Sequence, residues 1–110
     1  MTVRELAEKL GLKIFTKEAG LDKAVNSVYI GDLLSSVMSS TDKGDVWITI
    51  HTHINTVAVA ALNELSCIIL AESLEPEKNT LEKAMEVDVP ILGTDLSAYK
   101  IACRMHDLEL

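Results

Sequence analysis

The sequence is poor in cysteine, proline and aromatic residues. Two cysteines and two prolines occur among 110 residues, and aromatic side chains make up 4% of the chain. Two cysteines without a CxxC pattern cannot build a disulfide framework, which favours a reducing compartment. No apolar run approaches the roughly 18 residues of a membrane-spanning helix. The first ten residues carry four charged side chains in place of an apolar signal core, so we expect a cytoplasmic protein without a membrane route.

Basic residues are also scarce. The chain has 10 lysines and arginines against 17 acidic residues, a formal net charge of −7, which would repel a phosphate backbone and argues against nucleic acid as a partner. Hydrophobic residues make up 48% and charged residues 25%, values typical of globular proteins. A chain of this length buries about two thirds of its unfolded surface. We therefore expect one domain that covers residues 1–110.

Known catalytic motifs are missing. The sequence contains no GxxxxGK[ST], GxGxxG, HExxH or GxSxG pattern, and neither cysteine has a histidine beside it in the chain. These absences predict no cofactor and favour a role other than catalysis.

The first third of the chain predicts helix, strand, strand, helix. Thr2 and Glu5 form a capping-box pattern at the start of a helix that Gly11 ends. Residues 12–15 and 25–30 have the composition of short strands. Asp32 is placed to cap a following helix whose apolar residues are Leu33, Leu34, Val37 and Met38.

The remaining chain alternates strands with helices. We expect strands at Val46–Ile50, Ser66–Ala71 and Val89–Leu92, and helices that begin near Asn55, at Glu75 with Pro76, and after Thr94 as the helix cap. Strands joined by helices pair in parallel, so the pattern predicts an α/β fold with a mainly parallel sheet. Their carboxyl ends then share one edge, where three loops should meet, namely His51 to Asn55, Glu72 to Glu75 and Gly93 to Asp95.

The first of these loops contains two of the three histidines and opens into a helix. Free backbone N–H groups and the helix dipole favour an anion at such a position, and Thr52, His53, Asn55 and Thr56 add hydrogen-bond donors. Thr94, with the backbone after it, offers a similar arrangement on the neighbouring loop. One interpretation is a binding site for an anion or a nucleotide. The other is that Asn55 and Thr94 simply cap their helices.

A metal site is a second interpretation of the same loops. His51 and His53 point to the same side if the strand geometry continues that far, and Asp95 could add a carboxylate. This set would suit a metal-dependent hydrolase. An HxH pair at a strand end is also explained by turn chemistry, with one imidazole bonded to the backbone and the other in water.

The final helix carries two apolar stripes. One consists of Ala98, Ile101, Ala102, Met105 and Leu108 and is typical of a core-facing side. The second, weaker stripe consists of Leu96, Tyr99, Cys103, His106 and Leu110. This second stripe could face another subunit, which would make the protein a homodimer.

Five separated segments resemble the DRTGG domain family in order and spacing, over essentially the whole chain. They are Gly31 to Ser35, Val46 to Thr49, His53 to Ala60, Glu75 to Glu77 and Thr94 to Tyr99. The family is named for a loop that would fall at residues 22–28. Asp22 and Lys23 stand for its leading acidic and basic residues, whereas Asn26 and Ser27 stand where glycines are expected.

The resemblance implies a regulatory module with a three-layer α/β/α sandwich, similar to the amino-terminal domain of HPr kinase, which tends to form dimers. Similar domains accompany CBS domains in regulated pyrophosphatases and precede the catalytic part of some phosphotransacetylases. The family's recurrent polar positions fall on Thr49, His53, Asn55 and Thr94. The resemblance implies no catalytic reaction for a DRTGG domain that stands alone.

Together these observations predict a non-catalytic domain that senses a small ligand such as a nucleotide or an acidic metabolite. The predicted site residues are Thr49, His51, His53, Asn55, Thr94 and Asp95. The alternative is a structural or assembly module, which would bind another copy or a partner protein through the face of Tyr99, Cys103 and His106.

Overall fold

A five-stranded sheet forms the centre of the structure, a computed structural model that describes residues 1–110. The strands are β1 (Lys13–Ile14), β2 (Val28–Ile30), β3 (Val46–Thr49), β4 (Cys67–Leu70) and β5 (Ile91–Gly93). Their spatial order is β1-β5-β4-β3-β2, in which β1 runs antiparallel to β5 and all other pairs are parallel. The predicted α/β fold with a mainly parallel sheet is confirmed.

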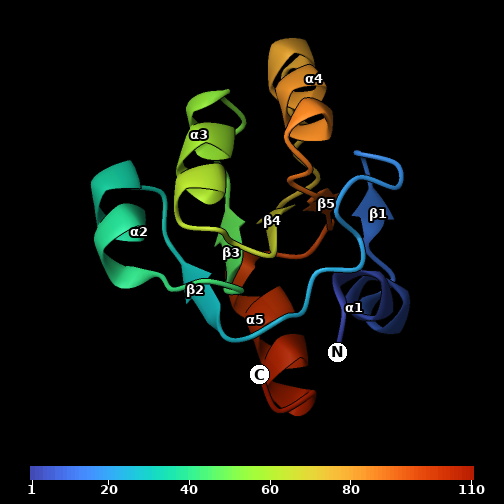
Figure 1. Cartoon of the computed structure of the whole chain (residues 1–110). Helices are drawn as coiled ribbons and strands as arrows, with labels where there is room; N and C mark the ends of the chain where they lie inside the picture. Colours follow the sequence, from blue (N-terminus) through green and yellow to red (C-terminus); the bar gives the residue numbers. More distant parts are fainter.

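Five helices cover the two faces of the sheet. They are α1 (Val3–Leu10), α2 (Leu34–Ser40), α3 (Asn55–Leu62), α4 (Lys78–Glu86) and α5 (Ala98–Asp107). Figure 1 shows α2, α3 and α4 on one side of the sheet and α1 and α5 on the other. This is the three-layer arrangement that the family resemblance implies. No helix combines the length and the apolar character needed to cross a membrane.

Two hydrophobic cores lie on opposite faces of the sheet. Val46 and Ile48 of β3 pack with α1 and α5, whereas Trp47 between them packs with α2, α3 and α4. Because successive side chains of a strand point to opposite faces, a strand covered on both sides must be apolar throughout. All residues of β3 and β4 are buried, which explains their nearly continuous hydrophobic sequence.

The amino-terminal helix begins and ends as its sequence predicts. The Thr2 hydroxyl accepts a hydrogen bond from the Glu5 backbone N–H, and the Glu5 side chain accepts one from the Thr2 backbone N–H. Gly11 ends the helix in the left-handed conformation, with φ of 63°. A residue without Cβ adopts this conformation without strain.

The predicted starts of the other helices need correction. Asp32 does not cap α2, because Leu33 is the cap and the Asp32 carboxylate instead binds the end of β3. Helix α4 begins at Lys78, so Pro76 precedes the helix and is not in its first turn.

The two polar residues proposed as helix caps are also placed differently. Asn55 is the first residue of α3 and not its cap, since Ile54 holds the cap position without a side-chain hydrogen bond. Ser97, not Thr94, caps α5 by accepting a hydrogen bond from the Lys100 backbone N–H. Helix α5 therefore begins three residues later than a Thr94 cap predicts, whereas α3 begins one residue earlier than an Asn55 cap predicts.

Candidate functional site

The three loops predicted to share the carboxyl edge of the sheet do meet there. Strands β3, β4 and β5 are parallel neighbours, so each delivers its following loop to the same edge. Backbone hydrogen bonds join the loops: Ser73 N–H donates to Thr94 C=O at 2.8 Å, and Glu77 N–H donates to Thr52 C=O at 3.2 Å. The edge is therefore a continuous surface with fixed backbone, as expected for a binding edge of an α/β sheet.

Two separate hollows lie along this edge. The first, which we call the histidine hollow, is a shallow depression of about 480 Å³. Its lining residues are Asp32, Ile50, His51, Thr52, His53 and Glu77. Within it the Nδ1 atom of His53 accepts a hydrogen bond from the Asn55 backbone N–H at 3.2 Å. That nitrogen of His53 thus stabilises the turn into α3, as the turn interpretation of the HxH pair anticipates.

Thr49 lies beneath the histidine hollow and does not reach its surface. Its side chain is buried, and its hydroxyl donates to Asp32 Oδ1 at 2.7 Å while accepting from the His51 backbone N–H at 3.2 Å. Both hydrogen-bonding roles of the hydroxyl are used within the protein. The geometry gives Thr49 a positioning role for the loop above it.

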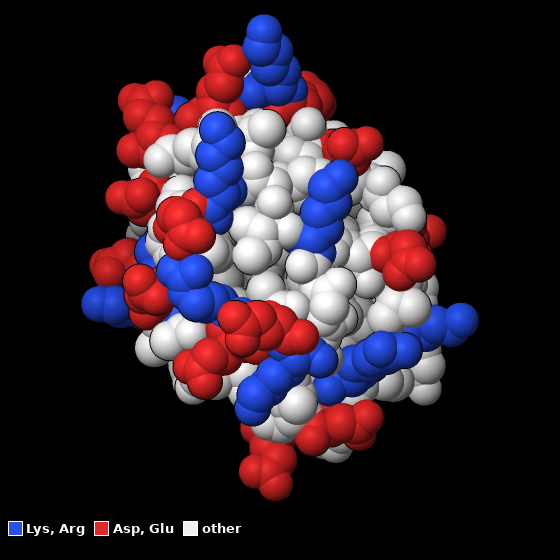
Figure 2. Space-filling model, turned by 90° about the vertical axis from the view of Figure 1, so that its right-hand side faces the viewer, with Lys and Arg blue, Asp and Glu red and all other residues white.

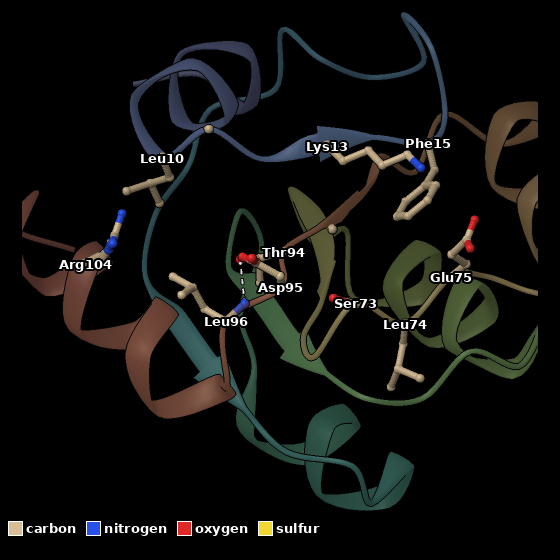
Figure 3. Close-up of a pocket in the computed structure, with 12 residues that line it drawn as sticks. Leu10, Lys13, Phe15, Ser73, Leu74, Glu75, Thr94, Asp95, Leu96 and Arg104 are labelled. Carbon is tan, nitrogen blue, oxygen red and sulfur yellow. Dashed lines mark hydrogen bonds between the residues drawn. The ribbon is translucent and has the colours of Figure 1, made fainter.

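The second hollow, which we call the β5 pocket, has a volume of about 560 Å³ and is shown in Figure 3. It is formed by the ends of α1 and β1, the loop after β4, the loop after β5, and one residue of α5. The lining residues are Leu10, Gly11, Lys13, Phe15, Ser73, Leu74, Glu75, Gly93, Thr94, Asp95, Leu96 and Arg104. This volume falls within the range of small-molecule sites.

Two cations line the β5 pocket, and neither forms an ion pair. Lys13 comes from β1 and Arg104 from α5, and no carboxylate lies within ion-pair distance of either side chain. In Figure 3 they stand on different sides of the pocket, with Thr94 and Asp95 between them. The chain as a whole carries −7, and Figure 2 shows basic and acidic side chains interspersed over one face of the molecule. Glu75 and Asp95 also line the pocket, so its four charges sum to zero, but the two cations are not neutralised by an ion pair.

Phe15 forms one wall of the β5 pocket and explains why position 93 is a glycine. A Cβ atom on Gly93 would lie 2.6 Å from Cε2 of the Phe15 ring, so only glycine allows this approach. The Lys13 ammonium lies over the ring, 4.9 Å from its centroid. This cation–π contact holds the lysine at the pocket without neutralising its charge.

The predicted site residues are divided between the two hollows. His51 and His53 line the histidine hollow, and Asn55 lies beside it at the start of α3. Thr94 and Asp95 line the β5 pocket, where the Thr94 hydroxyl accepts a hydrogen bond from the Leu96 backbone N–H at 3.1 Å. No residue lines both hollows.

The metal-ligand set proposed from the sequence does not form. The structure contains no group of three or more His, Cys, Asp or Glu residues placed to hold a metal ion, so His51, His53 and Asp95 do not converge. The set is wrong because the two histidines and the aspartate follow β3 and β5, and β4 lies between these two strands.

Sequence reasoning missed Lys13, Phe15 and Arg104. None of them follows a parallel strand, whereas the site residues predicted from the sequence all lie at or after the end of β3 or β5. They reach the edge because β1 pairs antiparallel with β5, at Lys13 opposite Gly93, and because α5 carries Arg104 back toward it. The sequence alone gave no sign of this antiparallel pairing.

The cysteines show no sign of redox chemistry at the site. Cys67 is fully buried at the start of β4, and burial raises the pKa of its thiol to about 12. Cys103 is exposed on α5. Cys67 is therefore a small buried apolar residue, whereas Cys103 presents its thiol to solvent.

Comparisons with known proteins bear on the whole chain. The family model described as DRTGG domain matches residues 5–108. A similar solved structure is described as the crystal structure of the CBS and DRTGG domains of the regulatory region of Clostridium perfringens pyrophosphatase, complexed with the activator diadenosine tetraphosphate. A search of curated protein sequences found no match.

The structural similarity covers nearly all of this chain and less than half of the other. The TM-score is 0.68 at 15% sequence identity, over 92% of this chain and 44% of the pyrophosphatase chain. At this identity the similarity shows a shared fold.

Proposed function

The chain belongs to the DRTGG domain family, and we propose that it is a non-catalytic regulatory domain that binds a small anionic ligand, specifically a nucleotide, at the carboxyl edge of its sheet. The observation that carries this proposal is the pair of unpaired cations, Lys13 and Arg104, at the β5 pocket. The similar pyrophosphatase structure supports the proposal, because its regulatory region is complexed with a nucleotide activator.

The chemistry of the β5 pocket suits a phosphate-bearing ligand. Arginine binds phosphate oxygens through its planar fork of donors, and lysine does so as a point charge. The Ser73 and Thr94 side chains bring hydroxyl groups to the same pocket. Glu75 and Asp95 also line it, so they would disfavour a highly charged anion unless their carboxylates meet sugar or base N–H and O–H donors.

Calorimetric titration tests the proposal. AMP, ADP, ATP and diadenosine tetraphosphate would be titrated into the purified chain and into a double variant, Lys13→Met with Arg104→Met. We expect one of these nucleotides to bind and the double variant to bind it at least about tenfold more weakly, since each charge-assisted phosphate contact contributes on the order of 1.5–3 kcal/mol. Lys100→Met is the matched control, because Lys100 is an exposed lysine of α5 outside the pocket.

Two further variants separate the hollows. His53→Ala and Asn55→Ala change the histidine hollow and its border without touching the β5 pocket. Binding that depends on these residues and not on Lys13 would move the site to the histidine hollow. Absence of binding by every nucleotide would contradict the proposal.

The second candidate function is assembly through α5. Tyr99 has 77% of its surface exposed, and the neighbouring Cys103 and His106 are exposed on the same helix. An exposed tyrosine of this kind is typical of protein interfaces. Sedimentation of the chain and of Tyr99→Glu, each with and without nucleotide, would test this alternative. It predicts a dimer that the variant dissociates and that nucleotide does not change.

A further inference from the structure

The largest hollow of the molecule lies at the opposite edge of the sheet from the β5 pocket. We call it the amino-edge cavity, because it lies where the chain enters the parallel strands: Asn26 precedes β2, Gly44 precedes β3 and Ser66 precedes β4. Its volume is about 700 Å³. The lining residues are Lys23, Ala24, Val25, Asn26, Lys43, Gly44, Ala60, Ala61, Glu64, Ser66, Val87 and Val89.

Apolar side chains from three parts of the chain form much of the cavity wall. Val25 comes from the segment before β2, Ala60 and Ala61 from the end of α3, and Val87 and Val89 from the segment between α4 and β5. Ala61 is exposed, so a larger side chain at this position would extend into the cavity. An apolar ligand body of a few carbons would therefore be sheltered from water here.

One charged group inside the cavity lacks a carboxylate partner. The Lys23 ammonium is half-buried and donates a hydrogen bond to the backbone carbonyl of Asp88. No carboxylate lies within ion-pair distance of it. Burial of the ammonium lowers the pKa of Lys23, an effect that the more distant Asp88, Cys67 and Glu64 oppose.

The other lysine of the cavity differs from Lys23. Lys43 is exposed at the rim and forms an ion pair with Glu64, with 3.3 Å between its Nζ and Glu64 Oε2. Two of the three N–H donors of Lys23 remain available after its bond to Asp88. Asn26 also lines the cavity, and its side-chain amide donates only a long hydrogen bond to Asp45 Oδ1, at 3.5 Å.

From this geometry we infer that the amino-edge cavity is a second ligand site, which binds a small aliphatic carboxylate. The carboxylate pairs with the Lys23 ammonium, and the aliphatic body packs against the half-buried Val25 and Val87. A charge that is already partly removed from water gains more from an incoming counter-ion than a solvated charge does. One half-buried cation near two acidic residues matches a monoanion better than a phosphate. The site is independent of the nucleotide site, because the two lie at opposite ends of the parallel strands.

Titration of the full chain with 4-methylpentanoate, followed by amide-proton NMR, tests the inference. We expect shifts centred on residues 24–26, 44 and 87–89. The isosteric neutral compound 4-methylpentanamide should bind at least about tenfold more weakly, because it carries no negative charge to pair with the Lys23 ammonium. Equal binding of the acid and the amide, or no binding of the acid, would overturn the inference.

Three variants sharpen this test. Lys23→Met should weaken binding of 4-methylpentanoate about tenfold, whereas Lys78→Met is the matched control and should leave it within about twofold, because Lys78 is an exposed lysine outside the cavity. Ala61→Leu should block the cavity without touching the lysine. Unchanged binding in Lys23→Met or in Ala61→Leu would contradict the site.

A measurement on the unmodified chain covers the case in which Lys23→Met does not fold. The Lys23 side-chain NMR signal would be titrated with pH in the presence and absence of 4-methylpentanoate. A bound carboxylate should raise the pKa of Lys23 toward its ordinary value, and an unchanged pKa at saturating acid would overturn the inference.

Discussion

The Thr49 hydroxyl donates a hydrogen bond to Asp32 Oδ1 at 2.7 Å, across 17 residues of sequence. The same carboxylate oxygen accepts from the Ile50 backbone N–H at 3.0 Å. Asp32 thereby ties the segment after β2 to the end of β3, directly below the histidine hollow. The contact replaces the helix cap that the sequence predicts for Asp32.

Thr49→Val should lower the free energy of unfolding by about 1 kcal/mol, because valine has nearly the same volume as threonine but lacks the buried hydroxyl that donates to Asp32. Urea denaturation would measure the loss. Ser35→Ala is the control, since Ser35 is exposed and makes no side-chain hydrogen bond, and it should change stability by less than about 0.5 kcal/mol. Equal effects of the two substitutions would contradict the importance of the Asp32 contact.

Gly93→Ala should lower the free energy of unfolding by about 1–3 kcal/mol, because its Cβ would lie 2.6 Å from the Phe15 ring. Adding Phe15→Leu should recover part of this loss by removing the clash. Thermal denaturation of the parent protein, the two single variants and the double variant forms a complete double-mutant cycle. Strictly additive losses would show that the ring does not limit position 93.

The capping box should make stability depend on pH through Glu5. The hydrogen bond from the Thr2 backbone N–H, then that from the Thr2 hydroxyl, holds the pKa of Glu5 below its ordinary value. A lowered folded-state pKa contributes stability that is present above the unfolded pKa of about 4.3 and is lost as pH falls through the folded value.

Glu5→Gln should therefore flatten the loss of stability on acidification below about pH 4.3, measured by denaturation at a series of pH values. Glu8→Gln on the same helix is the control, because the Glu8 side chain makes no capping contact. A pH profile that Glu5→Gln leaves unchanged would rule out this contribution.

Only one thiol should react in the folded protein. Burial raises the pKa of Cys67 to about 12, whereas Cys103 is exposed. With a thiol-reactive disulfide reagent at about pH 8, the native chain should release one equivalent quickly and the unfolded chain two. Cys103→Ser should abolish the fast phase, and a fast phase that survives this change would contradict the burial of Cys67.

Ser97→Ala should lower the free energy of unfolding by about 1 kcal/mol through the loss of the α5 cap. Ser97→Asp retains an acceptor for the Lys100 N–H and should stay close to the parent protein. Chemical denaturation distinguishes the two variants. Equal loss in both would show that the capping bond is not the cause.

Local sequence signals determined much of the fold. The capping box at Thr2 and Glu5 and the left-handed Gly11 depend on contacts within one helix, so their pattern is sufficient to predict them. Likewise, apolar strands separated by helices allowed the parallel sheet and its shared carboxyl edge to be predicted, because that connection leaves few other pairings.

Tertiary structure alone decided which polar residues share a hollow. Asp32 and Thr94 have the side chains of helix caps, but Asp32 found partners on β3, and Thr94 bonded to Leu96 while Ser97 took the cap position. Lys13 joined the β5 pocket through a two-residue antiparallel strand. Side-chain type and local spacing describe what a residue is able to bind, whereas packing of distant segments fixes which partner lies within reach.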